Sequence, residues 1–202
     1  MLVLCSNGLS SNKILAYMKE KVVSCKTAAL VVTADNEYKE NNYHVARCIK
    51  ELESLDLKVD IFDLDKQPAA LLSQYDVVEF IGGNPYYLLH SIRENNAQEI
   101  LRDIAQNKVI IGWSAAAFVF SPTLELVNCY SPEVNFIGLT DLNALSLTEV
   151  QVLPHYNRFL SKFENFEERC CEYEKEHDVR VIRINDGEGV FIDEEVYVCK
   201  ES

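Results

Sequence analysis

VIIGWSAAAF, residues 109–118, passes from a β-branched run through Gly112 and Trp113 into a run of small helix formers, with Ser114 at the junction. A short, continuous apolar run of β-branched residues is typical of a buried strand, and an alanine-rich run favours a helix. The stretch therefore predicts a buried strand that turns sharply into a helix. Ser114 would open that helix, where a serine serves either as the helix cap or, at the top of a sharp turn, as a nucleophile.

The segments before this stretch repeat the same alternation of strand and helix. We predict strands at residues 2–5, 28–33, 58–62, 76–81 and 108–111. Helical patterns lie between them at residues 11–21, 43–55, 68–74 and 86–106, the last divided near Asn95 and Asn96. This order predicts an α/β fold with a mostly parallel, doubly wound sheet, whose ligand sites lie beyond the carboxyl ends of the strands.

The pattern changes after Phe120. We predict strands at residues 124–128 and 147–153 and an acidic helix at residues 163–177. The remaining chain predicts a strand at residues 179–184, a turn at residues 185–187, and a hairpin at the sheet edge that includes residues 189–199. No composition break or repeat divides the chain, so we expect one domain over residues 1–202.

Composition restricts the class of protein. The formal net charge of −13 would repel a phosphate backbone, so nucleic acid is not an expected partner. The first residues lack the pattern of a signal peptide, and no run of about 18 apolar residues predicts a membrane span, so we expect a cytoplasmic protein. The seven cysteines are scattered without zinc-ligand spacing, so we interpret them as reduced thiols and expect no metal site.

Three sequence segments could carry chemistry, and each has a structural alternative. Gly112-Trp113-Ser114-Ala115-Ala116 approximates the G-x-S-x-G nucleophile elbow, against the alternative of a helix cap. Gly82-Gly83-Asn84 follows a strand and could direct backbone amides at an oxyanion or a carboxylate, against the alternative of a tight turn before a helix. His155 alone among the four histidines follows a predicted strand, where a general base would lie, against the alternative of a structural histidine.

Taken in order, three segments resemble the serine peptidase family of dipeptidase E (aspartyl dipeptidase), peptidase family S51. The segments are IGGNPYYLL at residues 81–89, GWSAAA at 112–117 and LPHY at 153–156, where the family carries GGGNTF-like, GWSAGA-like and NPHY-like segments. The resemblance extends to LCSN at residues 4–7 and EER at 167–169, and so covers most of the chain. It implies the class I glutamine amidotransferase-like fold, a flavodoxin-like three-layer sandwich. It also implies cleavage of dipeptides with an N-terminal aspartate by a Ser-His-Asp arrangement without metal or cofactor.

Carried over residue by residue, the resemblance makes Ser114 the nucleophile and His155 the base. The loop of Gly82, Gly83 and Asn84, together with the amide of Ala115, matches the oxyanion and substrate loop. Ala116 stands where the family has glycine, a departure that concerns the geometry of the elbow.

The third member of the triad does not transfer. The family has an Asn-Asp pair after the elbow, and this chain has Asn128-Cys129, whose thiol cannot stabilise an imidazolium as a carboxylate does. We expect a carboxylate from a neighbouring loop to replace it, with Glu133, Glu125 and Asp141 as the candidates.

The sequence therefore leads to a serine hydrolase that acts on a dipeptide or similar small amide, as a monomer or homodimer. A glutaminase or amidotransferase would share the fold but would require cysteine at the elbow. The alternative from another class is a catalytically weakened relative that binds a small molecule or a protein in the same cleft. A carboxylate within hydrogen-bond distance of His155 would favour the enzyme. An assembly role for the acidic helix at residues 163–177 is a third reading, against a simple solvated face.

Overall fold

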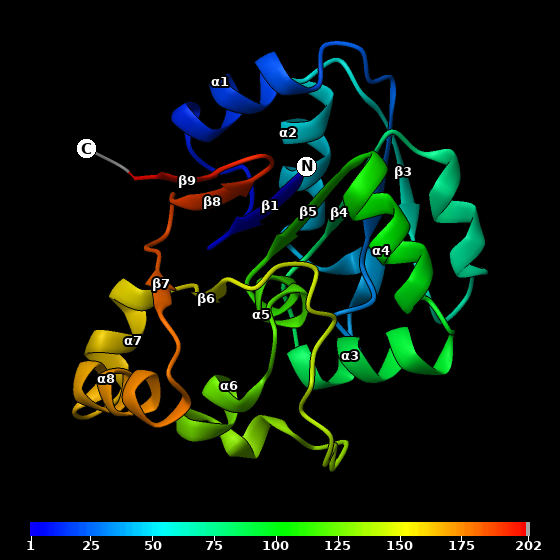
Figure 1. Ribbon diagram of the computed structural model, residues 1–202. Helices are drawn as coiled ribbons and strands as arrows, with labels where there is room; N and C mark the ends of the chain where they lie inside the picture. Colours follow the sequence, from blue (N-terminus) through cyan, green and yellow to red (C-terminus); the bar gives the residue numbers. More distant parts are fainter. Residues whose placement is uncertain (201–202) are drawn as a thin grey trace.

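The computed structural model describes residues 1–200 as a seven-stranded sheet with helices on both faces (Figure 1). The strand order is β3-β2-β4-β5-β1-β8-β9. The bounds are β1 Leu2–Cys5, β2 Thr27–Val31, β3 Lys58–Phe62, β4 Val77–Phe80, β5 Val109–Trp113, β8 Gly189–Ile192 and β9 Val196–Cys199. The first five strands pair in parallel, and β8 and β9 add an antiparallel edge beside β1. The predicted α/β fold with a mostly parallel sheet is confirmed.

Helices cover the two faces because successive strand residues point to opposite sides. On β4, Val78 and Phe80 join the core on one face, while Val77 and the following Ile81 join the core on the other. The first face is covered by α3 Pro85–Glu94, α4 Gln98–Asn107 and α5 Ala115–Phe120. The second face is covered by α1 Asn12–Lys21 and α2 Val45–Glu53. The result is the three-layer arrangement that the resemblance implied.

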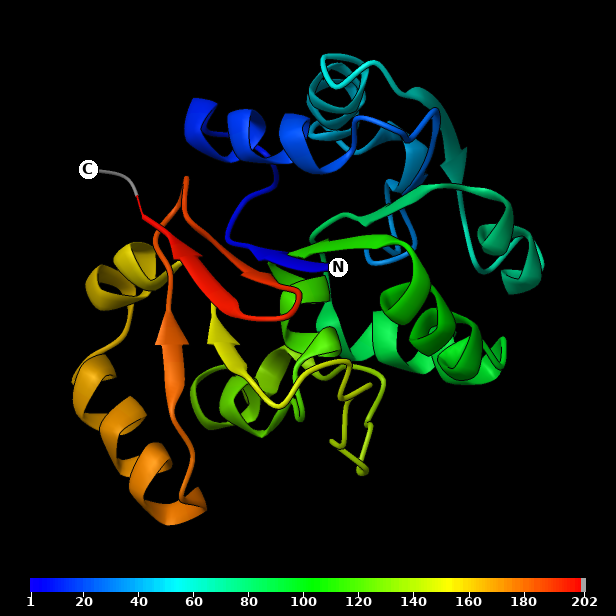
Figure 2. The same ribbon diagram turned by 45° about the horizontal axis from the view of Figure 1, so that its top comes forward.

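A second, two-stranded sheet lies beside the first and carries part of the site. It pairs β6 Gln151–Leu153 with β7 Val181–Arg183 in parallel, with Leu153 opposite Arg183. Between these strands the chain forms α7 Tyr156–Lys162 and α8 Phe166–His177, which Figure 2 shows beside β6 and β7. The parallel pairing brings the carboxyl ends of β6 and β7 to the same place.

Several predicted elements differ from the observed ones. Residues 124–128 form part of a helix, α6 Glu125–Tyr130, and not a strand, and the hydroxyl of Thr123 accepts a hydrogen bond from the Glu125 N–H at its start. Only the last three residues of the strand predicted at 147–153 are extended, and residues 68–74 contain a 3-10 helix, η2 Ala69–Gln74. A second 3-10 helix, η1 Lys39–Asn41, precedes α2, and a third, η3 Pro132–Val134, follows α6. Residues 185–187 do not close a hairpin, because β7 joins β6 and the edge hairpin is β8–β9 alone.

Within residues 1–200, no helix is both long enough and apolar enough to cross a bilayer.

Candidate active site

Ser114 occupies a strained turn between β5 and α5. Its backbone has φ 53° and ψ −112°, a region that a residue with a side chain adopts only when the surrounding structure holds it there. The Ser114 side chain forms no capping hydrogen bond with α5. Its Oγ instead lies 2.9 Å from His155 Nε2. The geometry is that of a nucleophile elbow rather than of a helix cap.

Small residues make the elbow possible. A Cβ added at Gly112 would lie 2.6 Å from the Phe120 ring and 3.1 Å from the Ala116 Cβ. Ala116 is fully buried against this glycine, so its methyl group occupies space that Gly112 leaves free. The alanine in place of the family glycine is therefore accommodated without loss of the elbow conformation at Ser114.

His155 follows β6 and begins α7 in the left-handed backbone region, with φ 57°. Its backbone N–H donates a hydrogen bond of 2.9 Å to Ser6 Oγ, which fixes the residue against the end of β1. Its ring nitrogen Nδ1 lies 2.7 Å from Asp186 Oδ1. With Nδ1–H donating to this carboxylate, Nε2 is the unprotonated nitrogen and accepts the Ser114 hydroxyl proton.

Asp186 is the carboxylate that reaches His155. It lies between β7 and β8, and its Oδ1 also accepts a hydrogen bond of 2.8 Å from Ser6 Oγ. The Arg158 guanidinium pairs with the other oxygen. Burial raises the pKa of Asp186, but the hydrogen bonds from Ser6 and His155 and the charge of Arg158 outweigh it and hold that pKa below its usual value. Asp186 is therefore ionised wherever His155 acts as a base.

The three acids expected for this position lie elsewhere. Glu125 Oε2 is 3.4 Å from His177 Nδ1, and Asp141 Oδ2 is 3.0 Å from Arg93 Nη2. Glu133 is in the 3-10 helix η3, and within residues 1–200 it makes no hydrogen bond or ion pair with His155. The expectation that one of them pairs with His155 is wrong, because Asp186 already occupies Nδ1.

From the sequence we placed Asp186 in a turn and missed its contact with His155. That contact depends on the pairing of β6 with β7, in which Leu153 is opposite Arg183 in a parallel register, and no local sequence signal predicts this pairing. His155 and Asp186 follow those two residues by two and three positions, so they leave neighbouring strands at the same end. Ser6 was also missed as a partner of both, although the segment that contains it was part of the resemblance.

The glycine loop after β4 lies against the elbow. A Cβ added at Gly82 would be 2.9 Å from the Ser114 Cβ, so the backbone of this loop lies next to the serine. Among residues 1–200 the backbone N–H groups of Gly82, Gly83 and Ala115 have no hydrogen-bond acceptor. Asn84 instead caps α3, because its Oδ1 accepts hydrogen bonds from the N–H groups of Tyr86 and Tyr87.

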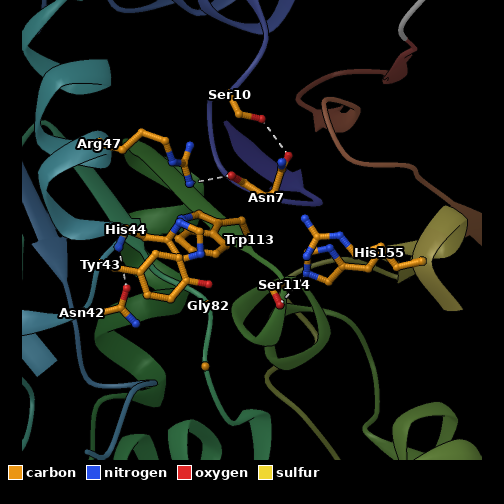
Figure 3. A pocket seen from close by; sticks show the side chains of 12 residues that line it. Asn7, Ser10, Asn42, Tyr43, His44, Arg47, Gly82, Trp113, Ser114 and His155 are labelled. Atoms are coloured by element: carbon orange, nitrogen blue, oxygen red, sulfur yellow. Dashed lines mark hydrogen bonds between the residues drawn. The ribbon is translucent and has the colours of Figure 1, made fainter. Parts of the chain in front are cut away.

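A cleft of about 310 Å³ opens over Ser114 and His155. Figure 3 shows His155 and Ser114 together on one side and Trp113, His44 and Tyr43 gathered on the other. The guanidinium groups of Arg47 and Arg158 also line the cleft, and among the described residues no carboxylate does. Such a cleft suits a small ligand that carries negative charge.

One group of side chains has the spacing for a metal, and it is not in the cleft. Within residues 1–200, Cys48, Glu51 and Glu79 each place one ligand atom within 4.8 Å of the others, and all three are buried. They lie beneath Trp113, whose indole N–H binds Glu79.

An α/β fold that brings serine, histidine and aspartate into one hydrogen-bonded series defines the class of serine hydrolases. The sequence model of peptidase family S51 matches residues 2–198, so the chain belongs to that family and is a peptidase. The family resemblance and the amidotransferase-like fold that it implied are both confirmed.

Two relatives and one solved structure are similar over most of the chain. The chain is 30% identical to the uncharacterized peptidase Lmo0363 of Listeria monocytogenes, over 83% of this chain and 82% of that protein. It is 26% identical to a peptidase E of a Shewanella species, over 75% of this chain and 64% of that protein. A crystal structure of a candidate peptidase E from Listeria monocytogenes EGD-e superimposes with a TM-score of 0.80 at 27% identity, covering 100% of this chain and 98% of that one.

Proposed function

We propose that this serine peptidase cleaves a dipeptide or similar small amide through an acyl-enzyme on Ser114. His155 takes the hydroxyl proton as Ser114 attacks the carbonyl carbon, and then gives that proton to the departing amine. Water repeats the sequence to release the acid. The observation that carries the proposal is the continuous series from Ser114 Oγ through His155 to Asp186, with contacts of 2.9 Å and 2.7 Å.

The free amides beside Ser114 support the same chemistry. The tetrahedral intermediate places a negative charge on the former carbonyl oxygen, and N–H groups already oriented toward that oxygen stabilise it. Ala115 follows the serine directly, and Gly82 and Gly83 lie against it. Their N–H groups are without acceptors in the described part of the chain and are thus available to an oxyanion.

The cleft favours a short and acidic substrate. Its volume of about 310 Å³ is at the lower end for small-molecule sites, which fits a dipeptide and not a folded protein. Arg47 and Arg158 line it with guanidinium groups, each paired with one carboxylate outside the lining, and their remaining N–H donors suit an N-terminal aspartate or a free carboxylate. We therefore place dipeptides with an N-terminal aspartate first among the candidates.

The experiment is hydrolysis of a panel of dipeptides and aminoacyl amides, each tested with N-terminal Asp, Asn, Glu and Ala. A second arm treats the enzyme with an aryl phosphonate that reacts with activated serines, and locates the adduct by peptide mass analysis. The proposal expects turnover that is highest for N-terminal Asp, and a phosphonate on Ser114 that blocks it. A folded protein that cleaves no panel member and takes up no phosphonate would contradict it.

The binding-module alternative rested on a missing triad acid and on Ala116 in place of the family glycine, and the elbow at Ser114 accommodates Ala116. Asp186 supplies a carboxylate at 2.7 Å from His155, which is the feature that favours an enzyme. No described contact favours the binding-module reading over hydrolysis.

The pH dependence should follow His155. Burial lowers the pKa of His155. The Asp186 carboxylate opposes this effect, but the pKa of His155 stays below its usual value of 6.5. Because the neutral ring is the base, kcat/KM should rise with pH through a midpoint below 6.5 and level off near neutral pH. The measurement is kcat/KM from about pH 4.5 to about pH 8 with a substrate that does not titrate in this range. A midpoint near 7 or higher would argue against neutral His155 as the base.

Gly83 should not tolerate a side chain. A Cβ at this position would lie 2.2 Å from the carbonyl oxygen of Ala34, a backbone atom that cannot move aside. Gly83→Ala should displace the loop and lower kcat by about 100-fold or more, the usual effect of losing an oxyanion donor. Gly138→Ala is the matched control, since Gly138 has φ +72° but no atom within 4 Å of an added Cβ. Equal losses in the two variants would exclude a specific role for the loop.

A further inference from the structure

Two carboxyl groups are buried beneath the cleft and are not used by the mechanism above. Glu79 lies on β4 with no exposed surface, and Glu51 on α2 is 9% exposed. One oxygen of each has a partner: Glu79 Oε1 accepts a hydrogen bond of 3.0 Å from Trp113 Nε1, and Glu51 Oε1 pairs with Arg47. The other oxygen of each, Oε2, is buried without a partner among the described residues.

One proton would balance the charge of this pair. Two ionised carboxylates beside a single Arg47 would leave a buried negative charge, which is strongly unfavourable. An oxygen of each carboxyl group and the Cys48 sulfur lie within 4.8 Å of one another. A proton on Glu79 would remove one of the two negative charges at this short separation, and the charges of Arg47 and Glu51 would then balance.

The surrounding titratable groups favour this state. Burial raises the pKa of Glu79 to about 8, and the charge of Glu51 contributes to the rise. Burial also raises the pKa of Glu51, against the opposing charge of Arg47. The nearby thiols of Cys48 on α2 and Cys5 on β1 have their pKa values raised by burial and by these carboxylates, so both are protonated at neutral pH and add no negative charge to the pair.

The buried pair is connected to the wall of the cleft. Trp113 precedes Ser114, and a Cβ added at Gly82 would lie 2.5 Å from the Trp113 ring, so the indole lies against the glycine loop. The Arg47 guanidinium lies over the same ring at 5.7 Å and donates a hydrogen bond of 2.8 Å to the carbonyl of Asn7. Figure 3 shows Trp113 and Arg47 in this wall. Glu79 binds the indole and Glu51 binds the guanidinium, so the pair fixes both parts of the wall.

We propose that Glu79 is a positioning residue: protonated beside Glu51, it holds Trp113 and, through Glu51, Arg47 at the wall of the substrate cleft. Loss of this proton sets two carboxylates against each other and loosens this wall. The expected effect on substrate binding rests on the proposed function, whereas the protonation of Glu79 does not depend on it.

The single tryptophan of the chain reports on this proton directly. Emission of Trp113 should change with a midpoint near the Glu79 pKa of about 8, about two pH units below the midpoint of ordinary tyrosine ionisation. His44 contacts the ring edge-on at 5.2 Å, but burial lowers its pKa, so it titrates below this midpoint. Glu79→Gln keeps a carbonyl for the indole and has no ionisable group, and should abolish the transition while the protein stays folded.

Three further variants separate the contributions of Glu51, Cys48 and Glu79 to the transition. Glu51→Gln should move the transition to lower pH, because the charge that raises the Glu79 pKa is removed. Cys48→Ala should leave a transition in place. Glu79→Leu should lose the hydrogen bond to the Trp113 indole at every pH. Glu79→Gln should keep that hydrogen bond, because its side-chain carbonyl can accept it.

Several outcomes would overturn the proposal. They are a flat wild-type titration, a transition that persists in Glu79→Gln, and a transition lost in Cys48→Ala. A transition that disappears when a chelator is added, and returns with Zn²⁺, would show that the free oxygens hold a cation instead.

Kinetics give a second readout on any substrate found in the panel. Above the transition KM should rise several-fold with little change in kcat, since the triad lies on the other side of the cleft, and Glu79→Gln should remove that rise. A fall in kcat alone would contradict the positioning role. The emission titration needs no substrate, so it tests the protonation of Glu79 even if no peptide is cleaved. The failure of this proposal can therefore be distinguished from the failure of the proposed function.

Discussion

Replacing Ser114 with alanine should lower kcat by several orders of magnitude, on the order of 10⁶-fold if the triad acts as a unit. The loss follows from the removal of the only atom that forms the acyl-enzyme, since the remaining amides and cleft can only bind and polarise the substrate. KM should change little, because Ser114 contributes one hydroxyl to a cleft lined mainly by other groups. Initial rates on the best panel substrate, with phosphonate labelling in parallel, measure the effect.

The folded structure should survive this change. Ser114 Oγ makes one hydrogen bond, to His155, so its removal should alter the free energy of unfolding by about 1 kcal/mol. Ser146→Ala is the matched control, since Ser146 also has a positive φ, 48°, and lies in an exposed loop. Its activity should equal that of wild type. A Ser114→Ala protein that keeps a tenth or more of the wild-type kcat would exclude Ser114 as nucleophile.

Local sequence signals predict the first half of the chain well. The strands β1 and β3 have the predicted bounds, and the break near Asn95 separates α3 from α4. Strand β1 is buried along its whole length, and α3 and α4 bury apolar residues at helical spacing, so the apolar pattern of these elements carries the information. The run at residues 124–128 is too short for periodicity to separate strand from helix, and the hydroxyl of Thr123 at its start favours the helix.

Helix α7 has no fully buried residue, and we predicted no element over its range. Its residues Tyr156 and Phe159 are partly buried and pack against the core, and the Phe159 ring contacts that of Phe166. Its first turn also carries Arg158, which pairs with Asp186. Two partly buried aromatic residues in a helix of seven residues are too short a pattern to predict it from the sequence.

The sequence predicts the site residues that directly follow a strand. It does not predict a residue whose contact depends on how two strands pair. Ser114 and His155 each follow an apolar strand, and the order of the motifs along the chain is enough to associate them. Asp186 is 31 positions from His155, and only the parallel register of β6 and β7 makes them neighbours. The expectation of an acid near residue 129 came from the resemblance alone, whereas the carboxylate that contacts His155 lies between β7 and β8.

Replacing Asp186 with asparagine should lower kcat by about 10⁴-fold, as the same change does in a well-studied serine protease. Asp186 accepts from His155 and Ser6 on Oδ1 and from Arg158 on Oδ2. An asparagine has one oxygen, and Arg158, which can only donate, attracts it. The NH₂ group then faces His155 Nδ1 and forces the proton onto Nε2, where it can no longer accept from Ser114.

The matched controls are Asp141→Asn and Glu125→Gln, which alter the acids expected from the sequence. Both pair with groups outside the cleft, Arg93 and His177, so each should leave kcat within about twofold, since surface ion pairs contribute little. A larger loss in either than in Asp186→Asn would return the role to that residue.

The double variant Asp186→Asn, Arg158→Ala tests the cause of the loss. Without Arg158 the asparagine can turn its oxygen toward His155 and Ser6, which restores the tautomer with a free Nε2. The kcat of the double variant should therefore exceed that of Asp186→Asn alone, by about tenfold if tautomer choice costs about 1.4 kcal/mol. Arg158 lines the cleft, so Arg158→Ala alone should raise KM for acidic substrates without a gain in kcat. If kcat falls further in the double variant, the tautomer is not what Asp186 controls, and its role is to supply charge alone.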